Sequence, residues 1–389
     1  MYKIRTYNNI SDKGLSCFDP EKYQCGEDMA EPDAILLRSH KLHGELIPDS
    51  VVAVARAGAG VNNIPIDEYS HRGIVVFNTP GANANAVKEM VAAALFLSSR
   101  KILSGAQYVR TLTEIDDAEA LGKQLEKEKK QFAGSELAGK TLGVVGLGAI
   151  GSRVANMALE LGMRVAGYDP AISVEAAWRL ASRVEKMDSL EALLAVSDYI
   201  TLHVPSIEQT RHLINVETLQ RCKPDARLLN FAREEIVDVE AVTAALDAGR
   251  LGTYVTDFPL PSLIGRSDTL LLPHIGASTR EAEQNCAVMA VEQLVDFLEH
   301  GNVRNSVNYP PTRMGREEGY RITFTNENVP RVLGSVLSVL ADHDVNVIDM
   351  VNKSQGDIAY NIIDVASEPT QSIIDSISAA EGVMHVRVI

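Results

Sequence analysis

Three glycines and an aspartate form the part of this sequence that most plainly could do chemistry. Gly146, Gly148 and Gly151 stand in G-x-G-x-x-G register in LGVVGLGAIG, after an apolar run and before a helical pattern, and Asp169 closes the next apolar run 18 residues later. Such glycines allow a tight turn and a close approach of backbone to a pyrophosphate, and the acidic residue favours a ribose 2′-hydroxyl over a 2′-phosphate. The pattern therefore predicts an NAD site that comprises Gly146, Gly148, Ala149, Ile150, Gly151 and Asp169.

Polar residues follow three later apolar runs. TLHVPS supplies His203 and Pro205, LLNFAREE supplies Arg233, and LLLPHIGAST supplies His274. Ligands of open α/β sheets bind outside the carboxyl ends of the strands, so we expect these residues to line the cofactor crevice. Either Arg233 or His274 alone would more often be structural, but their shared placement favours a functional interpretation.

These residue types suit the oxidation of a hydroxy acid. When a hydride leaves C2, the hydroxyl proton must leave too, and a histidine with a pKa near 7 can accept that proton and return it in the reverse direction. Arg233 would bind the substrate carboxylate through paired hydrogen bonds and polarise the developing carbonyl.

The elements that must position these residues fall into two alternating systems and a third, different one. Short apolar runs at 34–38, 51–57 and 74–77 predict parallel strands, and a second α/β sheet is predicted from residue 140 onward. After an Asn-, Pro- and Gly-rich linker the order becomes βαββαβ, which is ferredoxin-like. Further segments predict helices over 87–103, 287–301 and about 330–342, and a solvent-facing helix or loop over 121–131.

Composition sets limits on what the chain does. Its 389 residues suit two or three domains, and its net charge of −15 leaves no basic face for nucleic acid. No apolar run approaches the roughly 20 residues that a membrane span needs, and MYKIRTYNNI has no apolar core of a signal peptide. The four cysteines are scattered without a CxxC motif. We expect a soluble, cytoplasmic protein that binds neither metal, membrane nor nucleic acid.

Four motifs together resemble the D-isomer-specific 2-hydroxyacid dehydrogenases: GVVGLGAIG…YDP, HVPSIEQTRHLIN, LLNFAREEIVD and LPHIGASTREAE. The final βαββαβ unit resembles an ACT domain. The resemblance implies a Rossmann-type NAD domain (94–287) inserted in a flavodoxin-like substrate domain (1–93 and 288–312), with an ACT-like regulatory domain at 319–389. It further implies a homodimer or homotetramer.

The resemblance also implies a phosphorylated substrate. Members with this tail oxidise 3-phospho-D-glycerate to 3-phosphohydroxypyruvate, a step towards serine. In VARAGAGVNNI, Gly58 and Gly60 fit a nest of backbone N–H groups for the substrate carboxylate, and Arg56 matches a phosphate-binding arginine. Lys88 is either an additional phosphate contact or an ordinary surface lysine of a helix. Alternatives are a hydroxypyruvate or glyoxylate reductase of the same family, and an NAD-sensing protein without turnover.

The sequence departs from the family where a glutamate normally pairs with the catalytic histidine. In VTDFPLPS, Leu260, Pro261 and Ser262 occupy that region, and Asp257 is the one nearby acid at a strand end. Two interpretations stay open. Asp257 orients the His274 imidazole, alone or together with the nicotinamide, or His274 works without an acidic partner.

The ACT-like segment matches its relatives only in part. Asn328 and Asn346 stand where serine-binding relatives have asparagines, but Asn326 replaces a histidine and Arg331 replaces a glycine. An amino-acid effector and a simple dimerisation role therefore both remain open.

Overall fold

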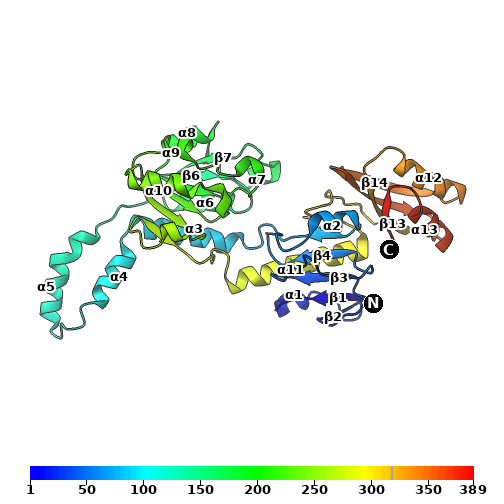
Figure 1. The fold of residues 1–389 in the computed structure, drawn as a ribbon, viewed down its shortest axis with the longest axis horizontal. Helices are drawn as coiled ribbons and strands as arrows, with labels where there is room; N and C mark the ends of the chain where they lie inside the picture. Colours follow the sequence, from blue (N-terminus) through cyan, green and yellow to red (C-terminus); the bar gives the residue numbers. More distant parts are fainter. Residues whose placement is uncertain (317–318) are drawn as a thin grey trace. The chain divides into compact units, whose positions relative to one another are not determined.

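A computed structural model describes residues 1–316 and 319–389 (Figure 1). The chain divides into two compact units: residues 1–83 with 280–389, and residues 84–279. The second unit is thus inserted in the first. Both crossings coincide with helix starts, because α3 (Ala84–Ser99) and α11 (Arg280–His300) each begin where the chain changes unit. The sequence analysis placed these crossings near residues 93 and 287.

The first unit contains a parallel five-stranded sheet with the order β2-β1-β3-β4-β5. One face packs on α11, through apolar residues such as Ala287, Val291 and Leu294. The sequence analysis predicted the last three strands and missed the first two, which carry exposed polar residues. The elements are β1 (Tyr2–Thr6), α1 (Asp12–Leu15), β2 (Tyr23–Gly26), β3 (Ala34–Leu37), β4 (Ala53–Arg56), α2 (Ile66–His71) and β5 (Val75–Phe77).

The second unit is a parallel seven-stranded sheet with the order β12-β11-β10-β9-β6-β7-β8. The order reverses between β6 and β9, which is the switch point where dinucleotide folds bind their ligand. Its strands are β6 (Thr141–Val145), β7 (Arg164–Tyr168), β8 (Glu185–Lys186), β9 (Tyr199–Leu202), β10 (Ala226–Asn230), β11 (Leu251–Thr256) and β12 (Thr269–Leu271). Its other helices and 3₁₀ turns are α6 (Gly151–Glu160), α7 (Val174–Trp178), α8 (Leu190–Val196), η2 (Glu208–Thr210), α9 (Val216–Leu219), η3 (Glu234–Ile236), α10 (Val239–Asp247) and η4 (Pro261–Leu263).

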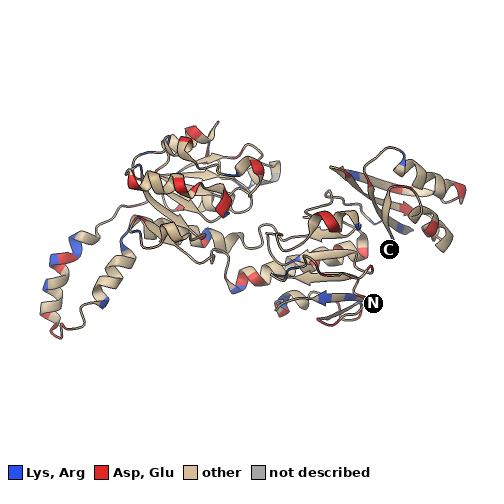
Figure 2. Ribbon diagram, in the orientation of Figure 1, with Lys and Arg blue, Asp and Glu red and all other residues tan. Residues whose placement is uncertain are grey.

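A helical hairpin follows α3. The sequence predicted one helix through residue 103, but α3 ends at Ser99 and α4 (Ile102–Arg110) starts afresh, because Ser99 O accepts a hydrogen bond from Ser135 N (3.0 Å) instead of continuing the helix. The hairpin continues with α5 (Ala118–Glu128) and η1 (Lys129–Phe132). Neither α4 nor α5 contains a buried residue, and charges of both signs alternate along α5 (Figure 2). The expected solvated helix near 121–131 is therefore confirmed.

Residues 320–388 form the predicted βαββαβ module. All neighbouring strands are antiparallel, in the order β14-β15-β13-β16, and the two helices cover the face that carries Ile322, Phe324 and Ile363. The elements are β13 (Tyr320–Glu327), α12 (Val332–Asp342), β14 (Val347–Gln355), β15 (Ile358–Val365), α13 (Gln371–Ser378) and β16 (Val383–Val388). Within the described residues, no helix has the length and apolar character of a membrane span.

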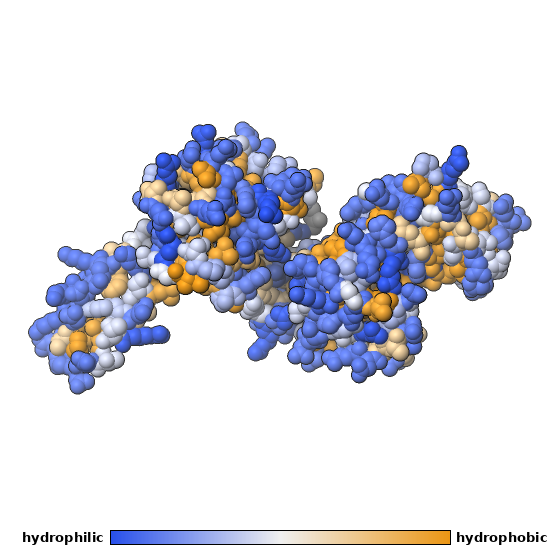
Figure 3. Space-filling model, in the orientation of Figure 1, coloured by the Kyte–Doolittle hydropathy of each residue, from blue (hydrophilic) through white to orange (hydrophobic). Residues whose placement is uncertain are grey.

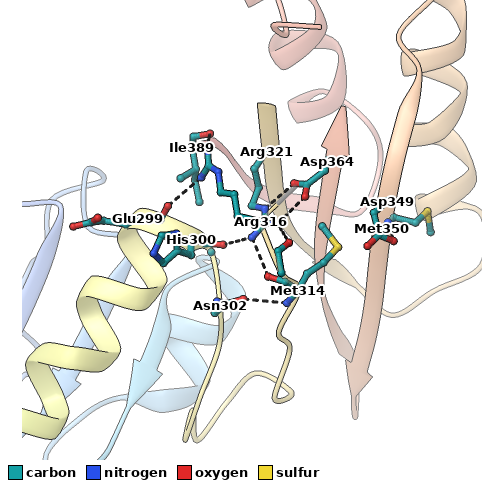
Figure 4. A network of polar contacts seen from close by, with 12 residues as sticks. Glu299, His300, Asn302, Met314, Arg316, Arg321, Asp349, Met350, Asp364 and Ile389 are labelled. Atoms are coloured by element: carbon teal, nitrogen blue, oxygen red, sulfur yellow. Dashed lines mark hydrogen bonds and ion pairs between the residues drawn. The ribbon is translucent and has the colours of Figure 1, made fainter. Parts of the chain in front are cut away.

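The C-terminal end of α11 meets this module through its backbone carbonyls (Figure 4). Glu299 O accepts from Arg316 Nη1 (3.1 Å), His300 O from Arg321 Nη1 (2.8 Å), and Gly301 O from the Tyr360 hydroxyl (2.7 Å). Arg321 is fully buried and forms a two-bonded ion pair with Asp364, both bonds 2.7 Å long. The last carbonyls of the helix, which lack partners within the helix itself, are thus satisfied by side chains from the segment 316–360.

Arg331 precedes α12 with φ +80° and ψ −23°, and its side chain makes no capping hydrogen bond. This left-handed conformation is the reason a glycine suits the position, because a Cβ there costs about 1–2 kcal/mol. We expect Arg331→Gly to raise the free energy of unfolding by roughly 0.5–1 kcal/mol after the entropy of glycine is subtracted. Urea denaturation checks this, with Arg331→Ala as the matched control. A gain of equal size in the alanine variant would contradict the explanation.

Candidate functional site

The glycine loop between β6 and α6 has the geometry of a phosphate cradle. Gly146 adopts φ +87°, and a Cβ there would lie 2.7 Å from His203 O. A Cβ on Gly151 would lie 1.9 Å from Gly146 O, so the helix start can pack on the turn only with glycine. Gly148, in contrast, faces open space with no heavy atom within 4 Å of its Cβ position. The loop therefore leaves room for a pyrophosphate beside Gly148, with the half-exposed Ala149 and Ile150 next to it.

Asp169 braces this loop from the end of β7. Its Oδ2 accepts from Leu147 N (2.8 Å) and its Oδ1 accepts from Ala171 N (3.0 Å). A carboxylate has about four acceptor positions, so both oxygens can still accept from a ribose hydroxyl. The residues present thus fit an NAD molecule whose adenosine ribose lies at the end of β7.

His203 lies at the end of β9, beside the glycine loop. Its backbone N–H donates to Val145 O (2.7 Å), and its Nε2 lies 2.9 Å from Thr201 Oγ1. Burial lowers the pKa of His203 to about 3, so the ring is neutral at pH 7. Its Nδ1 is buried and has no partner among the described residues. Pro205, two residues on, is exposed, and its carbonyl accepts from Thr210 Oγ1 (2.5 Å).

Arg233 follows β10 in an extended conformation that a buried asparagine holds. Asn230, which is 0 % exposed, donates from Nδ2 to Arg233 O (2.8 Å) and accepts at Oδ1 from Ala232 N (3.1 Å). The half-buried Arg233 side chain donates one hydrogen bond, from Nη1 to Ala232 O (2.6 Å). Since a guanidinium has five N–H donors, most of the donors of Arg233 remain for a bound carboxylate.

The Asp257 carboxylate makes no hydrogen bond or ion pair with the His274 imidazole. Its buried carboxylate accepts from Ile275 N at Oδ1 (2.8 Å) and from Gly276 N at Oδ2 (2.7 Å), and its backbone carbonyl accepts from His274 N (3.1 Å). Asp257 therefore positions the backbone of the histidine loop. The residues where relatives carry a glutamate form the 3₁₀ turn η4, in which Leu263 is buried.

The exposed His274 is oriented by its backbone and by one aromatic ring. It adopts φ +56°, and its ring meets that of Phe258 edge-on, with centroids 5.0 Å apart. Within residues 1–316 and 319–389 its imidazole has no hydrogen-bonded partner. Neither oxygen of Asp257 thus takes the part of the absent glutamate.

The first unit carries the other predicted residues in the loop after β4. All three carbonyls of Gly58, Ala59 and Gly60 point inward to donors: Thr79 N (3.1 Å), Asn78 Nδ2 (2.6 Å) and Arg56 Nη1 respectively. Within the described residues the amides of Ala59, Gly60 and Val61 have no acceptor. These three successive amides are therefore available to an anion, and the segment is here called the 59–61 nest.

Arg56 and its neighbour Arg38 have different surroundings. Arg56 is half-buried, and its Nε donates to Arg38 O (2.9 Å) while Nη1 holds Gly60 O, so its guanidinium braces the loop. Arg38 follows β3 on the adjacent strand and pairs with Glu283 (2.7 Å), with 43 % of its side chain exposed. The sequence analysis missed Arg38, although its place after the apolar run AILL was a signal that it follows a strand.

The remaining predicted residues lie elsewhere. Lys88 lies in α3, in the second unit, and donates to Asn85 Oδ1 (2.7 Å). Asn328 and Asn346 are exposed in the C-terminal module, where Asn328 Nδ2 donates to Gly356 O (3.0 Å) and Asn346 O accepts from Ala366 N (3.0 Å). The structure thus gathers the NAD-loop residues, Arg233, Asp257 and His274 at strand ends of one unit, and Arg56 and Gly58 at a strand end of the other.

The chain is similar to known proteins. Residues 102–276 match the family model "D-isomer specific 2-hydroxyacid dehydrogenase, NAD binding domain". D-3-phosphoglycerate dehydrogenase of Synechocystis sp. is 38 % identical over 72 % of this chain and 49 % of its own length, so the chain spans about half of that relative. The enzyme of that name from Haemophilus influenzae is 29 % identical over 87 % of this chain and 81 % of its own. The NAD⁺-bound structure of 3-phosphoglycerate dehydrogenase from Entamoeba histolytica matches with a TM-score of 0.60 and 25 % identity, over 79 % of this chain and 98 % of that one.

Substitutions of the loop glycines distinguish an effect on folding from an effect on cofactor binding. We expect Gly148→Ala to leave the melting temperature unchanged and to weaken NADH binding at least tenfold, because its Cβ enters only the space a pyrophosphate would take. Gly151→Ala should destabilise the fold as well, since its Cβ collides with Gly146 O. Thermal unfolding and NADH fluorescence titration measure the two effects. Wild-type NADH affinity in Gly148→Ala would contradict the placement of the pyrophosphate.

Asp257→Asn tests how the histidine loop is held. The amide keeps one acceptor but turns an NH₂ group towards one of the two backbone N–H donors, so one buried donor loses its partner at a cost of about 1–3 kcal/mol. We expect faster hydrogen exchange at Ile275 and Gly276 and lower catalytic turnover, while NADH affinity changes little. Asp268→Asn, which alters an acid paired with Arg266 in the same unit, is the control. Unchanged exchange at both amides would refute this role of Asp257.

Proposed function

We propose that the chain oxidises a D-2-hydroxy acid with NAD, because its residues 102–276 match the NAD-binding domain of the D-isomer specific 2-hydroxyacid dehydrogenases. The observation that carries this proposal is the placement of four functional groups on one sheet edge. The glycine loop, Asp169, Arg233 and His274 all follow the carboxyl ends of strands β6, β7, β10 and β12. That edge is where open α/β sheets bind their ligands.

The chemical roles follow from the free groups at these strand ends. The glycine loop and Asp169 would hold NAD, which would supply the hydride acceptor for C2 of the substrate. The His274 imidazole takes the proton of the C2 hydroxyl and passes it to solvent, to which the side chain is exposed. The unused N–H groups of Arg233 bind the substrate carboxylate and stabilise the negative charge that develops on the C2 oxygen. In the first unit, the free amides of the 59–61 nest are donors that suit an anion such as a carboxylate.

The substrate we propose is 3-phospho-D-glycerate, with 3-phosphohydroxypyruvate as product and serine synthesis in the cytoplasm as the setting. The relatives named above support this choice. A phosphate needs local cations on a protein with a net charge of −15, and Arg38 and Arg56 provide two on adjacent strands. In this proposal the first sheet, whose strand order is that of flavodoxin-like folds, belongs to the substrate domain. The C-terminal module is an ACT-like domain.

We further propose a homodimer that forms through the α4–α5 hairpin. Ile102, Leu103 and Val109 are each at least 50 % exposed, and they lie on helices that bury nothing within the second unit. Figure 3 shows apolar side chains among the polar ones of this hairpin. Helices without a tertiary face of their own are marginal in water, so a second copy of the chain would supply the missing contacts.

The test of the substrate compares 3-phospho-D-glycerate, D-glycerate and D-lactate by NADH formation. We expect turnover with the phosphorylated acid and little with the others. Arg38→Ala should raise KM for phosphoglycerate about tenfold, or about 1.4 kcal/mol, and leave KM for glycerate unchanged, because its exposed guanidinium can leave Glu283 for a phosphate. Arg56→Ala should raise both KM values, since it braces the 59–61 nest. No turnover with any acid despite NADH binding would favour an NAD-sensing protein.

The dimer is tested by light scattering of Leu103→Asp and Val109→Asp. Each change puts a charge into the exposed apolar surface of the hairpin, and we expect it to shift wild-type dimers towards monomers with the NADH affinity retained. Glu119→Gln, on the charged surface of α5, is the control and should leave the mass unchanged. Monomeric wild-type protein, or dimers in both aspartate variants, would refute this interface.

A further inference from the structure

The 59–61 nest depends on contacts from outside its own loop. Gly58 O and Ala59 O accept hydrogen bonds from Thr79 N and Asn78 Nδ2, both of which follow β5. The segment after β5 therefore determines which way the peptide groups of the loop face. A residue that fixes Asn78 and Thr79 therefore also orients the peptide groups that carry the amides of Ala59 and Gly60, while Arg56 holds the peptide group that carries the amide of Val61.

One side chain of α11 fixes Asn78. Gln293 is 4 % exposed and donates from Nε2 to Asn78 O (3.0 Å). Its Oε1 accepts from Asn305 Nδ2 (2.7 Å), and Asn305 O in turn accepts from Asn78 N (3.3 Å). The three residues close a ring of hydrogen bonds around the backbone of Asn78, with both ends of the glutamine amide in use.

The side chains that flank Gln293 on α11 are apolar. Its neighbours on α11, Val291 and Leu294, belong to the apolar cluster between that helix and the first sheet. An amide buried there is unfavourable unless it is hydrogen-bonded, and both ends of this amide are. The polar group is accounted for by what it holds, which is Asn78 and, through it, the nest.

We infer that Gln293 is a positioning residue that keeps the amides of the 59–61 nest directed at the substrate carboxylate. The substrate part of this inference rests on the function proposed above. Gln293 touches no reacting atom in this assignment. It acts through Asn78, which holds Ala59 O, and through Thr79, which holds Gly58 O.

The first measurement uses the full chain without substrate. Hydrogen exchange at Asn78 and Thr79 is followed in wild type, Gln293→Met, Gln293→Glu and Val291→Ala. Methionine keeps the length and removes both hydrogen bonds, while glutamate keeps the acceptor for Asn305 and loses the donor to Asn78. Val291→Ala weakens the same helix packing without touching the ring. We expect at least tenfold faster exchange in both Gln293 variants and wild-type rates in Val291→Ala.

The second measurement is steady-state kinetics with 3-phospho-D-glycerate. We expect KM for the acid to rise about tenfold in both Gln293 variants, with kcat within twofold and the NADH affinity unchanged. A general loss of stability would not raise KM while leaving kcat unchanged. Val291→Ala measures how far a loss of helix packing alone changes the two constants. Faster exchange with an unchanged KM would overturn the assignment, and so would wild-type behaviour of Gln293→Glu, because the donor to Asn78 would then be dispensable.

The two measurements fail separately. If wild-type protein oxidises none of the acids tested, the proposed function is wrong, yet the exchange rates still decide whether Gln293 holds the loop. Unchanged hydrogen exchange at Asn78 and Thr79 in both Gln293 variants contradicts the inference even when wild-type turnover is normal.

Discussion

The candidate catalytic centre depends on two hydrogen bonds. The backbone N–H groups of Ile275 and Gly276 donate them to the buried carboxylate of Asp257. These bonds join the end of β11 to the loop after the neighbouring strand β12. A buried carboxylate needs donors, and two backbone amides supply charge-assisted hydrogen bonds to it. Since these bonds go to the main chain of the loop and none goes to the imidazole, the aspartate positions His274 through its backbone, which adopts φ +56°, while the Phe258 ring packs against the imidazole.

The same construction recurs at the other strand ends. Asn230 holds the backbone around Arg233, Asp169 holds the glycine loop at Leu147, and Asn78 holds Ala59. In each case a carboxylate or amide side chain binds main-chain groups of a loop, and the groups proposed to meet cofactor or substrate are left with unused hydrogen-bonding capacity. The main-chain groups of such loops thus find partners, and Arg233 and His274 keep free hydrogen-bonding groups.

The sequence predicted those features that are local. The spacing of Gly146, Gly148 and Gly151 was enough to predict a tight turn between a strand and a helix. The βαββαβ order of the tail followed from alternating strand and helix patterns. It could not predict contacts between distant segments. The role of Asp257 depends on residues 18 and 19 positions later, and the bracing of Arg56 depends on Arg38. The strands β1 and β2 were missed because their exposed polar residues hide a pairing that only the assembled sheet makes favourable.

The insertion of the second unit imposes an order on synthesis. The apolar face of the first sheet is covered by α11, whose residues leave the ribosome about 200 positions after Asn83. At roughly 5–20 residues per second, that face waits about 10–40 s for its covering helix. During this interval the nascent chain exposes residues that are buried in the folded protein, such as Ala55 and Phe77. The discontinuous layout therefore prevents the N-terminal segment from completing its apolar core until residue 300 has been made.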